Sequence, residues 1–215
     1  MGGRTAFVVD GFNLYHSLIE ASESLGFADE TGTKWLDLWG LCNSYMHLFG
    51  ADASLVGVHY FSALAHHLKW VKPGVTVRHE HYADVLRATG VSVQFGNFKQ
   101  KQVKCRWCKR KFTRHEEKET DVAVAMKVLE IFHQDCADRV VLVTGDTDIA
   151  PAVRTAKALY PTRDVRFLFP WNRKMKELAK IAGQSFTIDR QKYVQHQLPD
   201  PLIVNGRSLA KPSSW

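Results

Sequence analysis

Four aspartates and one asparagine in this 215-residue chain stand just beyond short apolar runs or at the start of a helical pattern, where side chains can do chemistry. Asp10 follows the run TAFVV, and Asn13 comes three residues later. Asp146 and Asp148 follow the run RVVLVTG, and Asp121 lies in the first turn of the helical pattern TDVAVAMKVL. The carboxyl ends of parallel strands meet at one edge of a sheet, so neighbouring strands would bring these acids together.

The acids have an ordinary explanation and a chemical one. Singly, each fits a strand end or a helix cap, where Asp and Asn are common. Together, four neighbouring carboxylates repel one another, and a bound divalent cation removes that repulsion. Carboxylate oxygens with few imidazoles nearby suit Mg²⁺ or Mn²⁺ better than Zn²⁺. The metal ligands that we predict are Asp10, Asp121, Asp146 and Asp148.

A second candidate for function is the basic stretch at residues 99–118, KQKQVKCRWCKRKFTRHEEK, which carries nine Lys or Arg residues and two Glu. Aromatic residues stand between the cations. Such a strip suits single-stranded nucleic acid, because cations track the phosphates and flat rings stack on the bases. A solvated charge run is the plain alternative. The nucleic-acid contacts that we predict are Lys104, Arg106, Trp107, Lys109, Arg110, Lys111, Arg114 and Lys118.

The same stretch holds Cys105 and Cys108, which have the spacing of half a zinc site. A structural zinc needs four ligands, and the sequence has no second CxxC. Histidines such as His115, or a second chain in a homodimer, are two ways to complete a zinc site, and a metal-free pair is favoured over both. The other cysteines, Cys42 and Cys136, lie in apolar helical patterns and are predicted to pack in the interior.

The elements that must position these residues alternate between strand and helix. We predict strands at residues 5–9, 54–64, 91–98, 139–146, 164–170 and 185–188. We predict helices at residues 13–25, 35–49, 77–90, 120–135, 148–160 and 174–183. This alternation predicts an α/β fold with a mainly parallel sheet and helices on both faces, because parallel strands need crossovers that helices supply.

The chain length fits one substantial domain. We assign residues 1–190 to that domain, with the basic stretch as an insert at about 99–118, and residues 191–215 to a C-terminal tail that is either docked or disordered. Trp35, Trp39 and Trp70 are predicted to pack in the core or at its rim.

Composition narrows the choice of partner and compartment. The formal net charge of +7 favours a polyanionic partner without identifying one. No apolar stretch approaches the roughly 18 residues of a membrane helix, so no membrane partner is expected. The N-terminus lacks the features of a signal peptide, and we therefore expect a cytoplasmic protein.

Three segments taken together resemble the NYN domain family, a branch of the PIN-like metal-dependent nucleases. They are FVVDGFNLYHS (7–17), EEKETDVAVAMKVL (116–129) and VVLVTGDTDIAPAVRTAK (140–157). Their order matches the family pattern over most of residues 5–189. One position departs from it, because the family commonly has Gly in E-K-G-x-D where this chain has Glu119.

The resemblance implies a PIN-like sheet between helices. It also implies that acids bind Mg²⁺ or Mn²⁺ and that the resulting metal site hydrolyses RNA. Carried over by position, Asp10 is the central ligand, Asp121 is the second acid, and Asp146 and Asp148 complete the site. Asn13 orients a ligand or the substrate phosphate.

The leading hypothesis from the sequence is thus a metal-dependent ribonuclease acting on single-stranded RNA. A non-catalytic RNA-binding or scaffold module on the same fold is the alternative. A phosphatase with Asp10 as nucleophile is a weaker rival, because Phe12 stands where that chemistry usually places a second acid.

Overall fold

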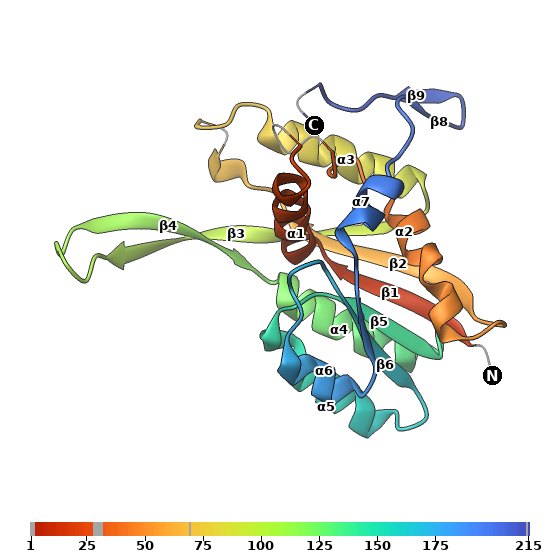
Figure 1. Ribbon diagram of the computed structural model, residues 1–215. Coiled ribbons are helices and arrows are strands. Elements are labelled where there is room, and N and C mark those ends of the chain that lie inside the picture. Colours follow the sequence, from red (N-terminus) through yellow and green to blue (C-terminus); the bar gives the residue numbers. More distant parts are fainter. Residues whose placement is uncertain (1–2, 28–31, 69, 214) are drawn as a thin grey trace.

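Figure 1 shows a twisted sheet between two layers of helices in the computed structural model of the chain. The structure describes residues 3–27, 32–68, 70–213 and 215, without the side chains of residues 67, 99, 112 and 114–118. The strands of the main sheet are β1 (Arg4–Asp10), β2 (Ser54–Ala63), β3 (Ser92–Lys104), β4 (Lys111–Lys118), β5 (Arg139–Val143), β6 (Asp164–Phe169) and β7 (Ser185–Thr187).

Two layers of helices and a short second sheet complete the fold. The helices are α1 (Gly11–Ser24), α2 (Leu38–Ser44), α3 (Val75–Ala88), α4 (Thr120–His133), α5 (Ala150–Leu159), α6 (Lys176–Ala182) and α7 (Arg190–Gln195). The 3-10 helices are η2 (Met46–Phe49), η3 (His66–Leu68) and η4 (Thr147–Ile149), and the second sheet pairs β8 (Leu202–Val204) with β9 (Arg207–Leu209).

The strand order β4-β3-β2-β1-β5-β6-β7 confirms the predicted α/β fold class. All neighbours are parallel except β3 and β4, which pair antiparallel. The chain runs outward from β1 to β3 and then returns to place β5 on the other side of β1. The order therefore reverses between β1 and β5, and ligands of open α/β sheets bind at such a point, beyond the carboxyl ends of the strands.

The apolar run of β1 is explained by burial on both faces. Phe7 and Val9 lie in a core cluster with residues of α1, α2 and α3. Ala6 and Val8 lie in a second cluster with residues of α4, α5 and α6. Because alternate side chains of a strand point to opposite faces, a strand covered on both sides must be apolar at every position. That pattern ends at Asp10.

Several predicted elements differ from the structure in extent, among them those at 35–49 and 91–98. The predicted helix at 35–49 is wrong in extent, because Asp37 caps α2 through a hydrogen bond from Gly40 N to Oδ1 (2.9 Å) and the chain tightens into η2 after Tyr45. The predicted strand at 91–98 is too short. It continues to Lys104, so that the basic stretch is a β3–β4 hairpin that projects from the body of the protein (Figure 1).

The C-terminal residues pack against the first core cluster. Tyr193 is fully buried, and its hydroxyl group is 2.9 Å from Ser17 Oγ of α1. Leu198 N donates to Trp35 O at 2.8 Å, and the Trp35 indole donates to Pro199 O at 3.1 Å. The segment beyond residue 190 is thus docked through helix α7 and the strand-like residues that follow it.

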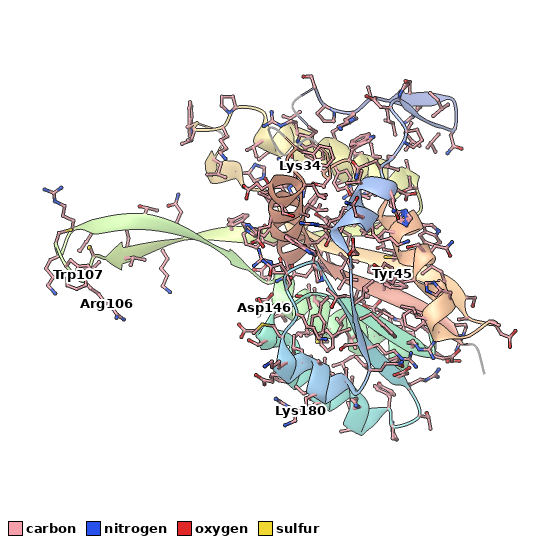
Figure 2. The ribbon with its side chains drawn as sticks, viewed as in Figure 1. Lys34, Tyr45, Arg106, Trp107, Asp146 and Lys180 are labelled. Atoms are coloured by element: carbon pink, nitrogen blue, oxygen red, sulfur yellow. The ribbon has the colours of Figure 1, made fainter. Side chains whose placement is uncertain are left out.

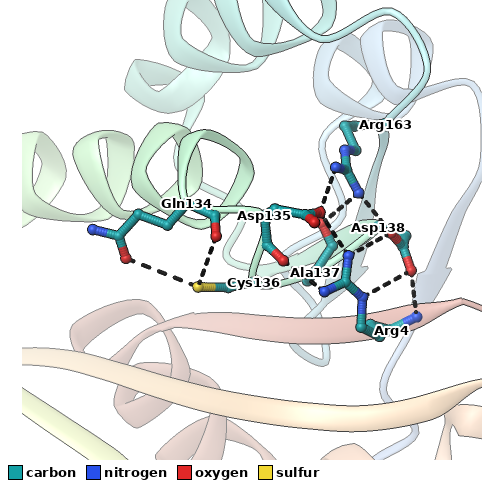
Figure 3. Close-up of polar contacts among 7 residues, drawn as sticks. All are labelled: Arg4, Gln134, Asp135, Cys136, Ala137, Asp138 and Arg163. Atoms are coloured by element: carbon teal, nitrogen blue, oxygen red, sulfur yellow. Dashed lines mark hydrogen bonds and ion pairs between the residues drawn. The ribbon is translucent and has the colours of Figure 1, made fainter.

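Arginine–aspartate pairs fasten the amino ends of β1 and β5 (Figure 3). Arg4 Nη2 is 2.9 Å from Asp138 Oδ1, and Arg163 lies 2.5 Å from the same oxygen and 2.6 Å from Asp135. Hydrogen bonds from Arg4 lower the pKa of Asp138 to about 2. Cys136 is exposed in this loop, so its predicted interior position is wrong, whereas Cys42 is buried as predicted.

His79 of α3 gives the fold a pH dependence that can be measured. Its ring meets Phe95 edge-on, with centroids 5.5 Å apart, and burial lowers its pKa from 6.5 to about 4. The folded state therefore binds this proton less tightly than the unfolded state. We expect the stabilisation to be complete above pH 6.5 and to be lost as the pH falls toward 4, by about 1–3 kcal/mol.

Urea unfolding of the wild type and of His79→Gln between pH 7 and pH 4 checks this expectation. The variant should lose less stability than the wild type over that range. The exposed His133→Gln is the control for removal of a histidine. Parallel pH curves for the wild type and His79→Gln would show that His79 is not the group responsible.

Candidate active site

Asp10 ends β1 and begins α1, and its carboxylate is held by three hydrogen bonds. Oδ1 accepts from Phe12 N (3.1 Å) and Asn13 N (3.0 Å), which caps the helix. Oδ2 accepts from Thr144 Oγ1 (2.9 Å), in the loop that follows β5. The side chain is 8% exposed. Asp10 is therefore both a cap residue and a carboxylate fixed at the point where the strand order reverses.

Gly11 allows α1 to begin close to β2. A Cβ atom built at this position would lie 2.4 Å from the Tyr60 ring and 2.7 Å from Phe61 O. Any larger residue would push α1 away from the sheet and move Asp10 with it. The Asp-Gly pair of the sequence thus reflects close backbone packing beside the carboxylate.

The loop after β5 is locked to its neighbours on two sides. Gly145 N donates to Asn13 Oδ1 at 2.9 Å, so the amide of Asn13 joins the start of α1 to this loop. A Cβ atom at Gly145 would lie 2.1 Å from Arg173 O, in the loop after β6. Asp146 N donates to Thr144 Oγ1 (3.0 Å), and Asp146 Oδ1 accepts from Asp148 N (3.0 Å).

The predicted acids lie close enough to affect one another's ionisation. Burial is the largest cause that raises the pKa of Asp10, and the charges of Asp121 and Asp146 raise it further, against hydrogen bonds that lower it. The pKa of Asp121 is raised by desolvation first and then by the charges of Asp146 and Asp148. Negative charge is thus concentrated at this edge of the sheet.

These acids share an edge but do not form a ready-made coordination sphere. Among the residues that the structure describes, no three His, Cys, Asp or Glu side chains are grouped closely enough to hold a metal ion. One oxygen each of Asp10 and Asp146 accepts from backbone N–H groups. The donor set consists of carboxylates, which fits a hard divalent cation, and Asp121 and Asp148 are exposed side chains that can change rotamer at low cost.

Glu119 occupies a backbone conformation that favours glycine. Its φ is +78°, in the left-handed region, directly before α4 and Asp121. This explains why the family pattern has Gly at that position. Its carboxylate accepts a hydrogen bond from Asn97 Nδ2 of β3 (3.0 Å), so Glu119 joins the root of the hairpin to the helix that carries Asp121.

The predicted nucleic-acid contacts at the tip of the hairpin are exposed but lie apart from the acids. Figure 2 shows Arg106 and Trp107 at the far end of the hairpin and Asp146 near its root. Trp107 is 94% exposed. The exposed cations of this end are Lys104, Arg106, Lys109, Arg110 and Lys111. The side chains of Arg114, His115 and Lys118 lie outside the description.

A cleft that the sequence did not reveal lies beyond the carboxyl end of β2. It has a volume of about 600 Å³, and its lining includes Trp70, Phe98 and Asn97. Trp70 is 96% exposed, so its predicted packing role is wrong. Ala63 pairs with Gly96 in the β2–β3 register, whereas Asp10 pairs with Phe61. The cleft is thus beyond the carboxyl end of β2, at the same edge of the sheet as Asp10.

Comparison with known proteins identifies the family. The NYN domain family matches residues 4–189. The chain belongs to the NYN domain family. This confirms the resemblance seen in the sequence, and it assigns the domain a nuclease-like fold of the PIN-like kind.

A solved structure is similar in fold to this NYN domain. It is a protein of unknown function from Vibrio parahaemolyticus, with a TM-score of 0.54 and 19% sequence identity, and the match covers 87% of this chain and 94% of that one. This likeness concerns the fold alone. No curated protein matches the chain. Within the described residues, no helix is both long and apolar enough to cross a membrane.

Thr144 is a site residue that the sequence analysis missed, and its role is testable. Thr144→Val removes the donor to Asp10 Oδ2 and the acceptor for Asp146 N, which leaves a buried carboxylate short of one hydrogen bond. We expect a loss of about 1–3 kcal/mol in the free energy of unfolding in metal-free buffer at pH 7.

Thr144→Ser is the matched control, because it keeps the hydroxyl group and removes only a methyl group, at a cost of about 1 kcal/mol. Urea unfolding of both variants measures the difference. Equal losses in the two variants would mean that packing of the methyl group, and not the hydrogen bonds, is what Thr144 contributes.

Proposed function

We propose that this NYN domain is a metal-dependent ribonuclease that hydrolyses phosphodiester bonds of single-stranded RNA where β1 and β5 end. The observation that carries the proposal is the group of acids at the point where the strand order reverses. Asp10 is 8% exposed, and burial first, then the charges of Asp121 and Asp146, raise its pKa. This arrangement of acids lowers the stability of the fold. A bound cation that takes part in a reaction would offset the repulsion and give the acids a function.

The donor set favours Mg²⁺ or Mn²⁺ held by Asp10, Asp121, Asp146 and Asp148. Such a cation supplies an activated water and balances the charge that develops on the phosphate. The chain's own part is to hold the ligands. Backbone N–H groups and Thr144 fix the orientation of Asp10, and Asn13 keeps the β5 loop against α1.

The cleft at the same edge of the sheet as the acids supports a single-stranded substrate. Trp70 and Phe98 offer flat rings at its walls, and base stacking on such rings needs no particular sequence. Asn97 of the cleft is bonded to Glu119, two residues before Asp121. An RNA strand with a base stacked in the cleft would therefore run past the acids.

A non-catalytic RNA-binding module is the second candidate function. The exposed cations and Trp107 at the hairpin tip favour it, because they lie far from the acids and could bind RNA without them (Figure 2). The two candidates differ in turnover, and that difference is measurable.

Asp146→Asn tests catalysis with little disturbance of the fold. Asparagine keeps an oxygen that can accept from Asp148 N, as Asp146 Oδ1 does at 3.0 Å, but it loses the negative charge. We expect cleavage of labelled single-stranded RNA in Mg²⁺ or Mn²⁺ to fall by at least about 100-fold, with the thermal transition nearly unchanged.

Asp52→Asn, an exposed aspartate at the opposite edge of the sheet, is the control and should cleave as the wild type does. Equal cleavage by Asp146→Asn and the wild type would remove the proposed site. An intact wild type that leaves RNA uncut with both metals would rule out catalysis and support the non-catalytic candidate.

Trp70→Ala tests the path of the RNA through the cleft. Loss of one stacking ring is worth about 1–3 kcal/mol, which corresponds to about 5- to 150-fold weaker binding. Fluorescence anisotropy with labelled RNA in the Asp146→Asn background measures affinity without cleavage. Since Trp70 is 96% exposed, its removal should leave the stability of the domain unchanged.

Trp70→Phe keeps a flat ring and should retain most of the affinity. Trp107→Ala, at the hairpin tip, separates the contribution of the tip from that of the cleft. Affinity that depends on Trp107 and not on Trp70 would contradict the path through the cleft.

A further inference from the structure

The turn at the tip of the β3–β4 hairpin brings two thiols together. Cys105 N donates to Arg110 O (2.8 Å), and Lys109 N donates to Cys105 O (3.0 Å), which closes a six-residue turn. Hydrogen bonding with the backbone of Cys108, the backbone of Trp107 and the side chain of Cys108 lowers the pKa of the Cys105 thiol. The turn thus places the two cysteine side chains near each other, with backbone groups of the turn beside the Cys105 sulfur.

A simple hairpin does not need this turn. Two-residue turns with Asn or Gly close antiparallel strands with less chain. Here Lys109 instead adopts φ of +60°, a left-handed conformation that costs a residue with a side chain about 1–2 kcal/mol. This strain suggests that the turn serves to position the two thiols. Backbone N–H groups near a thiolate are suited to a metal-bound sulfur.

The pair cannot complete a zinc site within the described chain. Zinc in structural sites takes four ligands, and no group of three is found among the described side chains. Cys42 is buried in the core, and Cys136 lies near the amino end of β5. The backbone of His115 pairs with Gln100, four residues along β4 from Lys111, and is therefore about 13 Å from the turn.

We propose that Cys105 and Cys108 of two copies of this chain together bind one Zn²⁺, which joins the hairpins tip to tip. The second copy supplies the same pair, so that two-fold symmetry gives the four thiolates of a closed tetrahedral site. The hairpin projects from the body, so the tips can meet while the bodies stay apart (Figure 1). Each thiol releases its proton to solvent as its sulfur binds the ion, and no electron is transferred.

Charge around the tip is consistent with this site. Arg106, Lys109 and Arg110 are exposed beside the thiols, and without a metal they would repel the same residues of a second copy. A Zn²⁺ ion with four thiolates carries a net charge of about −2, which offsets that repulsion. Dimer formation should therefore require the ion.

Zinc titration of the full chain, reduced and freed of metal, tests the proposal by native mass spectrometry and by metal analysis. We expect one zinc per two chains, a dimer that returns to monomer when a chelator is added, and a tetrahedral thiolate absorption spectrum when Co²⁺ replaces zinc. Cys105→Ser and Cys108→Ser should each abolish the zinc-dependent dimer. Cys136→Ser, which alters an exposed cysteine elsewhere, should keep it.

Three results would overturn the inference. They are one zinc per monomer, equal zinc uptake by the wild type and the variant that carries both tip substitutions, and a dimer that forms equally well without metal. The measurements do not depend on RNA cleavage. Failure of this proposal therefore leaves the ribonuclease proposal untouched, and the Asp146→Asn variant should dimerise with zinc as the wild type does.

Discussion

The hydrogen bonds of the Asp10 carboxylate are the interaction on which the candidate site depends. They join the end of β1, the first turn of α1 and the loop after β5 through one side chain. Gly11 and Gly145 make this junction possible, because a Cβ atom at either position would collide with neighbouring residues. Once the junction forms, the backbone positions of Asp146 and Asp148 are restricted. Asp10 is therefore costly to bury as a charge, but its hydrogen bonds hold the neighbouring segments in place.

The pKa values of aspartates are shifted in opposite directions at the amino and carboxyl ends of the strands. At the amino ends of the strands, Asp138 faces Arg4 and Arg163, and its pKa is lowered to about 2. At the carboxyl ends, burial and then the charges of neighbouring acids raise the pKa values of Asp10 and Asp121. The first edge gains stability from its charges, whereas the second loses stability because of them. This contrast within one sheet separates the part of the protein that holds the fold from the part available for function.

The sequence predicted the sheet and the acids because both depend on local signals. Apolar runs of strand length and helical periodicity fixed the fold class, and acids that follow strands fixed the edge where they meet. Trp70 and Thr144 were missed for a different reason. Whether a tryptophan is buried, or a hydroxyl group faces a carboxylate 134 residues away, depends on tertiary contacts that leave no pattern in neighbouring residues. The sequence predicted the basic stretch but not that it forms two paired strands. Polar residues with solvent on both sides of a strand resemble an unstructured charge run.

The geometry of the hairpin limits what its charges can do. From Asn97 to Lys104 the paired strands extend about 23 Å at the usual rise per residue. Interactions between exposed charges are screened over about 8 Å at physiological salt, so cations at the tip cannot neutralise the acids at the root. The cations at the tip must therefore act on a molecule that contacts the tip, either a polyanion or the tip of a second copy. At the root, Glu119 has a positive φ and accepts a hydrogen bond from Asn97, which joins the hairpin to the helix that carries Asp121.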